Sequence, residues 1–281
     1  MSQRTLWTIA ILLLGAVVGG AYWWQLPAPA PKRPAIAAVP VVAPPASAAS
    51  ASPSIRFPID ADAPAPQAGS ASGTRTGDAA NPMVDALVEA LGRKAVLEFL
   101  NVDAFAYRVA VTVDNLARSH APARLLPVHP AGGRFGTQTV SADYPSAVIT
   151  AENAKRYAAF VSWVETLDMK TVSALYRRLY PNFQRAYEEL GYPGRYFNDR
   201  VVDVIDHLLE TPQLQDPIPV KLPDIKGPIQ PTRPWVMVEF ADPSIEARSA
   251  GQKMLLRMGQ GNAMRIKAKL RELRAALTRP R

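Results

Sequence analysis

The segment 168–191 has the sequence DMKTVSALYRRLYPNFQRAYEELG, and it indicates the fold class of the chain. Its larger apolar residues recur at the intervals that place them on one face of a helix. They are Val172, Leu175, Leu179, Phe183 and Leu190. Asp168 can cap the start of this helix and Gly191 can end it, whereas Pro181 predicts a bend or a restart. We therefore expect a long amphipathic helix here.

Segments on both sides have the same periodicity, and each begins with a residue that can cap a helix. Asn81, followed by Pro82, begins the first of them. Asp103 begins the second and Thr150 the third, and Asn198 begins a further one after the glycine turn. The pattern predicts a helical domain built around the long central helix.

Two stretches rich in proline or glycine interrupt the helices. Residues 212–234 hold seven prolines, which indicates an extended connector, and residues 235–240 then have the pattern of a strand. Residues 125–139 form a loop or a short hairpin on the same reasoning. We therefore predict that residues 82–281 form a mainly α domain with a minor β element.

The end of the chain carries the whole charge excess. The net charge is +8, and residues 253–281 contain nine Lys or Arg and one acid. We predict a basic helical hairpin over residues 244–278, with one helix ending near Met258 and a second beginning at Asn262. The second helix carries a narrow apolar stripe of Ile266, Leu270, Leu273 and Leu277.

Three interpretations of this hairpin are open. In the first, the stripe packs on the domain while the basic side chains keep their charges in water. In the second, Lys267, Arg271 and Arg274 bind an anionic surface such as phospholipid head groups, lipopolysaccharide or an acidic protein. In the third, the two helices bind nucleic acid, but the stripe is too regular for a free recognition helix. We therefore expect no nucleic-acid partner.

The turn after the long helix has the highest density of side chains suited to ligand binding. These candidates are Tyr192, Arg195, Tyr196, Asn198, Asp199 and Arg200. Aromatic and bidentate groups in a turn can reach a glycan or a peptide. The alternative is that the tyrosines form a core and its lid, and that Asn198 and Asp199 cap the next helix.

The sequence assigns no catalytic residue, metal site or cofactor. The chain has no cysteine, and its three histidines, His120, His129 and His207, lack the spacing of a zinc site. Asp203 and His207 are four residues apart, a spacing more typical of a contact on a helix surface than of an oriented base. These observations favour a binding protein over an enzyme.

Residues 6–24 have the sequence LWTIAILLLGAVVGGAYWW and contain no charge. A helix of this length is about 28 Å long, close to the ~30 Å hydrocarbon core of a bilayer, with aromatic residues at both ends. A cleaved signal peptide is the alternative, but its apolar region is typically shorter. We expect a transmembrane helix over residues 6–26.

Residues 27–81 are rich in Pro and Ala, and their few larger apolar side chains are too scattered to bury a core. This composition predicts a disordered linker. The low charge of the linker poses little barrier to translocation, so we place residues 1–5 in the cytoplasm and the bulk of the chain in the periplasm.

Four stretches carry a resemblance to a known family: TVDNL at 112–116, ELGYPGRYFNDR at 189–200, VIDHLL at 204–209, and SAGQK to KAKLR over 249–271. They resemble a proteobacterial family catalogued as a domain of unknown function, over most of residues 83–278. The resemblance implies an N-terminal spanning helix, a Pro/Ala-rich spacer and a Gram-negative envelope. It supplies no catalytic residue.

The sequence thus predicts a single-pass inner-membrane protein whose periplasmic domain binds or scaffolds an anionic envelope component or a protein partner. The alternative is a cell-wall hydrolase or its accessory, with Glu188, Glu189 or Asp199 as acid and base. A membrane-tethered cytoplasmic regulator follows if the topology is reversed. An open groove with two converging carboxylates would favour the hydrolase, and a filled core would favour the scaffold.

The topology can be tested with a reporter. Alkaline phosphatase fused after Arg281 should be active in cells, because its disulfides form in the oxidising periplasm and not in the cytoplasm. An inactive phosphatase, together with a fluorescent cytoplasmic-type reporter at the same position, would reverse the assignment.

Overall fold

The computed structural model describes residues 54–59, 81–140, 146–221 and 237–279, all within a compact unit that begins at residue 51. The predicted N-terminus at 1–5, the spanning helix at 6–26 and most of the linker lie outside the described residues. No helix in the described ranges is both long enough and apolar enough to cross a membrane.

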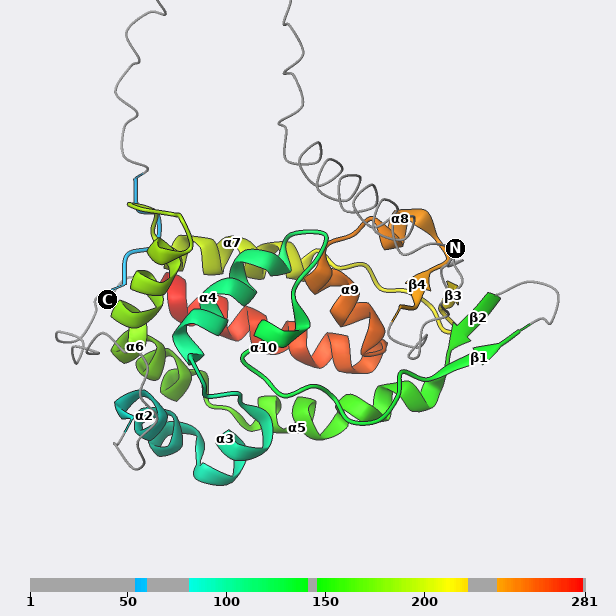
Figure 1. The fold of residues 1–281 in the computed structure, drawn as a ribbon, viewed down its shortest axis with the longest axis horizontal. Coiled ribbons are helices and arrows are strands. Elements are labelled where there is room, and N and C mark those ends of the chain that lie inside the picture. The colour runs from blue at the N-terminus through cyan, green and yellow to red at the C-terminus, as the bar shows by residue number, and fades with distance from the viewer. Residues whose placement is uncertain (1–53, 60–80, 141–145, 222–236, 280–281) are drawn as a thin grey trace, which may run out of the picture. The chain divides into compact units, whose positions relative to one another are not determined.

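The fold is mainly helical with a small antiparallel sheet, as predicted. The α-helices of the described ranges are α2 Pro82–Leu91, α3 Arg93–Phe99, α4 Phe105–Leu116, α5 Ala158–Thr166, α6 Met169–Glu189, α7 Phe197–Leu209, α8 Pro243–Glu246, α9 Ala250–Arg257 and α10 Gln260–Thr278. Short 3-10 helices occupy Ala123–Leu125 and Ala151–Tyr157. Figure 1 shows α4, α6, α7 and α10 arranged around one another.

The central helix α6 forms as its sequence predicts. Asp168 caps it by accepting hydrogen bonds from the amides of Lys170 and Thr171. Pro181 lies inside α6 without ending it, because buried side chains on both sides of it, Leu179 and Phe183, hold the helix against its neighbours. Of the predicted bend or restart at Pro181, the restart is therefore wrong.

Two predicted caps are also wrong. The N-cap of α4 is Ala104, at a φ of 46°, and the Asp103 carboxylate lies 3.6 Å from Arg108 instead of on a helix amide. The N-cap of α7 is Tyr196, and Asn198 lies within the first turn, fully buried. Asn198 cannot cap α7 because its side chain is bonded to a distant part of the chain, described below.

The C-terminal hairpin differs from its prediction in its first half. Two short helices, α8 and α9, replace the single helix expected there, because Asp242 caps α8 and Ser249 caps α9. The second helix, α10, begins at Gln260, two residues before the predicted start.

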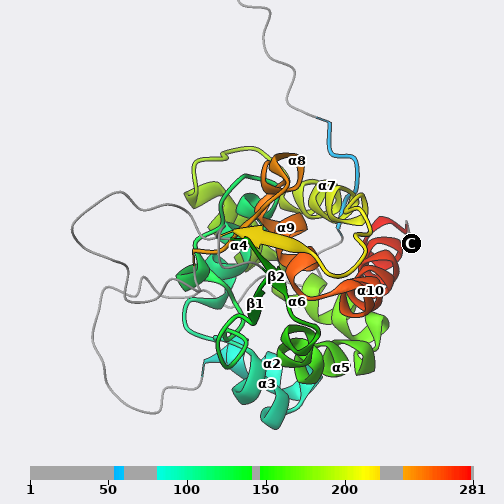
Figure 2. The same ribbon diagram turned by 90° about the vertical axis from the view of Figure 1, so that its right-hand side faces the viewer.

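The apolar stripe of α10 packs into the domain, which confirms that part of the first interpretation of the hairpin. Leu277 is buried in the main core, and Leu270 and Leu273 pack against that core. Ile266 and Leu270 also pack on a neighbouring cluster around Val204. Figures 1 and 2 show α10 beside α7, α6 and α5, which all contact it.

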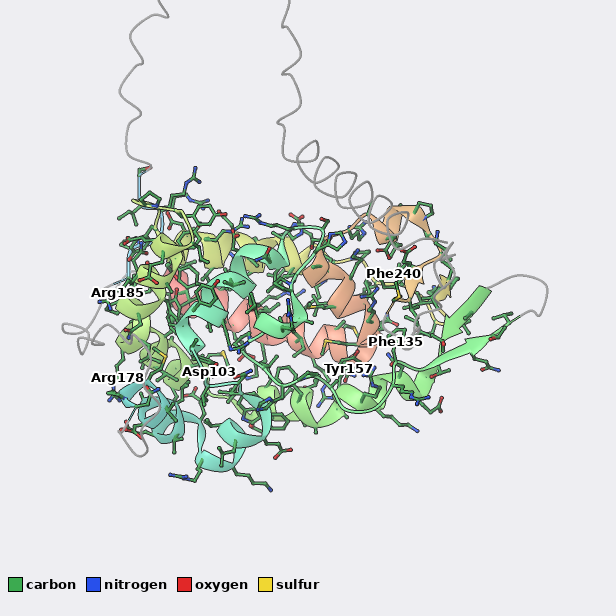
Figure 3. The ribbon with its side chains drawn as sticks, viewed as in Figure 1. Asp103, Phe135, Tyr157, Arg178, Arg185 and Phe240 are labelled. Carbon is green, nitrogen blue, oxygen red and sulfur yellow. The ribbon has the colours of Figure 1, made fainter. Side chains whose placement is uncertain are left out.

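The sheet has the strand order β1-β2-β3-β4 and is antiparallel throughout. Its strands are β1 Thr137–Thr139, β2 Ser146–Ile149, β3 Pro219–Lys221 and β4 Glu239–Phe240. Of the predicted strand 235–240, Glu239 and Phe240 form β4, Met237 and Val238 lie outside it, and residues 235–236 are outside the described ranges. Phe240 is buried and Phe135 packs against it, so the sheet has a small core of its own (Figure 3).

We expect Leu270→Ala to lower the free energy of unfolding by about 2 kcal/mol, because it leaves a cavity between two apolar clusters. Leu97→Ala is the control, since the Leu97 side chain is 66% exposed, and its effect should stay within about 0.5 kcal/mol. Urea unfolding of both variants measures the difference. Equal stability of the two would mean that the stripe is not packed.

Candidate functional site: a strap bound at the start of α7

Two glycines and one glutamine shape the turn between α6 and α7. Gly191 and Gly194 have φ values of 99° and 72°, which residues with a Cβ rarely adopt. The Gln184 side chain on α6 donates to the Arg195 carbonyl at 2.8 Å and accepts from the Phe197 amide at 2.8 Å. The start of α7 is therefore tied to α6.

Tyr180 supports the same turn from the core. Its hydroxyl donates to the Gln184 side chain at 3.0 Å and accepts from the Asn198 amide at 3.3 Å. Burial raises the pKa of the Tyr180 hydroxyl, with a smaller contribution from Tyr176, so it stays a protonated donor at neutral pH.

Residues 54–59, with the sequence SIRFPI, lie against the first turns of α7, and we call them the strap (blue in Figure 1). The amides of Arg56 and Phe57 donate to the two carboxylate oxygens of Asp199 at 3.0 and 2.9 Å. The Ile59 amide donates to the Tyr196 hydroxyl at 2.6 Å. Proline has no amide hydrogen, so every backbone N–H group from 56 to 59 is bonded.

Two strap carbonyls are bonded as well. The Phe57 carbonyl accepts from the Asn198 side chain at 2.9 Å, and the Ile59 carbonyl accepts from the Tyr196 hydroxyl at 3.3 Å. The contacts are made to the backbone of the strap, which bends at Arg56 and Phe57, so they select a chain with this backbone geometry more than any one side chain.

The strap side chains add an ion pair and an apolar contact. Arg56 Nη2 donates to both oxygens of Asp203 at 2.7 Å, and this hydrogen bond raises the pKa of the guanidinium, which stays charged. Phe57 and Ile59 are half-buried against the main core.

Asp199 and Asp203 differ in how much free energy they contribute to binding of the strap. The Arg56–Asp203 pair is half exposed, and such pairs contribute about 1 kcal/mol or less. Asp199 instead accepts two amide hydrogen bonds, and a hydrogen bond to a charged group contributes about 1.5 to 3 kcal/mol. Asp199 therefore contributes more than Asp203.

A cavity of about 320 Å³ lies beside the strap, and Ser54 and Arg56 form part of its lining. Buried Asp114 lies at another side of it and accepts from Arg118 at 2.7 Å and from the Tyr192 hydroxyl at 3.1 Å. Further lining comes from Tyr187, Arg195, Tyr196, Asp199, Arg200 and Asp203.

The structure brings the six predicted ligand-binding residues together. Tyr196, Asn198 and Asp199 bind the strap, whereas Tyr192, Arg195 and Arg200 line the cavity. The competing interpretation, in which Asn198 and Asp199 cap a helix, is wrong. For the tyrosines it is correct in part, because the Tyr192 ring stacks on buried Tyr187 at a centroid distance of 4.6 Å.

Sequence reasoning missed Gln184, Asp114 and the role of Asp203 in this site. Gln184 and Asp114 lie on helices, and the periodicity of a helix predicts its apolar face but not the hydrogen-bond partners of its polar side chains. The spacing in the sequence pairs Asp203 only with His207, but His207 Nε2 lies 2.9 Å from the Ser249 hydroxyl instead. In the described ranges, no group of three His, Asp or Glu residues could hold a metal ion.

The three candidates for an anionic surface do not form one free cationic face. Lys267 Nζ donates to the Thr211 carbonyl at 2.8 Å, and Arg274 is paired with Asp206. Arg271 is exposed at the edge of an apolar groove that Lys267 also lines. Binding of an anionic surface by these residues stays a prediction.

The comparison with family models finds one match, over residues 105–274, to a family described as proteins of unknown function, DUF3014. The chain belongs to the DUF3014 family. No curated protein and no solved structure matches it. The DUF3014 match includes α6, α7 and the residues that hold the strap, whereas the strap itself lies before the matched region. The membrane anchor and the proteobacterial source stay predictions.

We expect Asp199→Ala to speed hydrogen exchange at the Arg56 and Phe57 amides at least about tenfold, because both lose a charged acceptor. Asp203→Ala should speed it less than about fivefold, because an exposed pair is lost. Glu189→Ala, which removes a charge outside the strap contacts, is the control. Unchanged exchange in Asp199→Ala would mean that the strap is not held there.

Proposed function

We propose that this chain is a membrane-tethered binding module whose helical domain recognises a peptide segment of an envelope protein at the start of α7. The strap supports this proposal most, because its backbone amides and carbonyl groups are hydrogen-bonded to the domain as those of a bound peptide would be. The predicted helix at 6–26 would supply the anchor, with the domain on the periplasmic side. This role requires binding and no catalysed reaction.

The contacts favour a peptide over the glycan considered from the sequence. Donors and acceptors on Tyr196, Asn198 and Asp199 are spaced for successive amide and carbonyl groups of a chain. Glycan recognition would use a tyrosine face for stacking, but the Tyr196 hydroxyl is engaged with backbone and the Tyr192 face with Tyr187. A peptide with the backbone geometry of residues 54–59 matches this set of groups without rearrangement.

The strap is then a ligand held in cis. Five of its backbone groups are bonded, and Phe57 inserts an aromatic ring against the core. A partner peptide of similar character would have to displace it, so the strap lowers the apparent affinity for such a partner.

The hydrolase alternative receives less support. A glycosidase needs one carboxyl group as acid and a second as base or nucleophile on either side of a bound substrate. Around this site, Asp114 is bonded to Arg118, Asp199 to strap amides, and Glu188 to the Gln184 side chain at 2.7 Å. Each of these carboxylates therefore has a structural partner, which favours binding over hydrolysis.

The proposal is tested by supplying the strap in trans. A labelled synthetic peptide of residues 52–59 should bind the full chain that carries Arg56→Glu and Phe57→Ala, because those changes weaken the strap in cis. The peptide should bind the unmodified chain more weakly than it binds the double variant. Adding Asp199→Ala to the double variant should also weaken peptide binding relative to the double variant. Fluorescence anisotropy measures all three. Binding to no chain, or equal binding with and without Asp199, would contradict the proposal.

A further inference from the structure

The cavity beside the strap is unusually rich in arginine. Four arginines and three aspartates line it, so its lining carries one net positive charge. Three of the arginines, Arg118, Arg195 and Arg200, belong to the domain, and the fourth, Arg56, belongs to the strap. Guanidinium groups are the side chains best suited to hold a carboxylate.

The ion pairs and hydrogen bonds inside the cavity leave some arginine N–H donors without an acceptor. Asp203 is paired with Arg56, and Asp199 accepts two strap amides. Asp114 is the one carboxylate paired with both Arg118 and Arg200 in the described residues, at 2.7 and 3.4 Å, and Arg118 also donates to the Tyr192 hydroxyl at 2.6 Å. The aspartates are thus occupied while the domain arginines outnumber their acceptor.

Two of these arginines keep free donors. Within the described residues, the exposed Arg195 side chain makes no hydrogen bond or ion pair. The Nε of Arg200 is buried and also has no hydrogen-bond partner in the described ranges. A buried N–H group without an acceptor costs free energy, so an anion that accepted from it would be stabilised there.

The strap indicates where such an anion would come from. Ser54 lines the cavity together with Arg56. A serine hydroxyl is short and neutral and cannot neutralise a guanidinium. An acidic side chain at the same position would extend toward the arginines.

We propose that the cavity is an anion subsite of the peptide site, and that it receives an acidic side chain two residues before the basic residue of the bound peptide. The inference rests on the proposed function and adds the chemistry of the partner. The preferred ligand has an acidic residue at the position of Ser54, a basic residue opposite Asp203 and an aromatic residue at the position of Phe57. The strap lacks the first of these, so a partner that has all three can displace it.

The test introduces the missing charge into the full chain. Ser54→Glu should slow hydrogen exchange at the Arg56 and Phe57 amides about two- to fivefold relative to Ser54→Gln, the range of a partly exposed ion pair. The neutral glutamine has the same size, so the comparison isolates the charge. Adding Arg195→Gln, which touches no strap hydrogen bond, should abolish most of the gain.

Two outcomes would overturn the subsite. Equal exchange in the glutamate and glutamine variants would show that the cavity does not favour an anion. A gain that persists undiminished with Arg195→Gln and in 1 M salt, where the Debye length falls to about 3 Å, would show that charge attraction in the cavity is not its cause. Either result leaves the peptide site intact, because peptide binding in trans is measured separately with the native Ser54.

Discussion

Burial of the aromatic face of α6 is the interaction on which the rest of the domain depends. Phe183 and Tyr187 on this face contact Phe197, the first residue of α7, at ring distances of 6.2 and 5.3 Å. Aromatic side chains bury more apolar area than any others, and α4, α7 and α10 all pack around this helix. Phe197 is fully buried, so the start of α7 cannot move independently of α6.

This constraint turns the first turn of α7 into a rigid binding surface. Phe197 fixes the backbone from inside, and the Gln184 side chain fixes it from the turn. The next two residues, Asn198 and Asp199, therefore present an amide donor and a carboxylate in fixed positions toward the strap. Groups that are already ordered lose little entropy when a segment binds to them, which is why the short strap can be held by so few contacts.

The sequence predicts those parts of the structure that are determined locally. Asp168 caps α6, and Asn81 caps α2, because an N-cap bonds to amides two or three residues away. The density of polar and aromatic residues in the turn after α6 also predicts a candidate site there, next to the residues that bind the strap. What that turn binds could not be predicted from the same local rules.

The missed features depend on contacts between distant parts of the chain. Asn198 has the composition of a helix cap, but its side chain bonds to Phe57, 141 positions away in the sequence. Phe57 and Ile59 stand in a tract whose average composition predicts a linker, and their burial depends on a surface built by other segments. The composition of a segment indicates whether the segment can form a core by itself. The apolar side chains of the strap are buried against the core of the domain, which composition does not predict.

The position of the strap has a consequence for the proposed tether. If residues 6–26 anchor the chain, a bound strap leaves only residues 27–53 as the spacer, which reach roughly 80 Å as a polyproline II chain. Release of the strap extends the spacer to residues 27–80 and the reach to roughly 170 Å. Under the proposed function, the free energy that holds the strap would oppose this extension, and a peptide that displaced the strap would extend the reach of the domain. Recognition and distance from the membrane would then be coupled through the same few hydrogen bonds to Asp199, Asn198 and Tyr196.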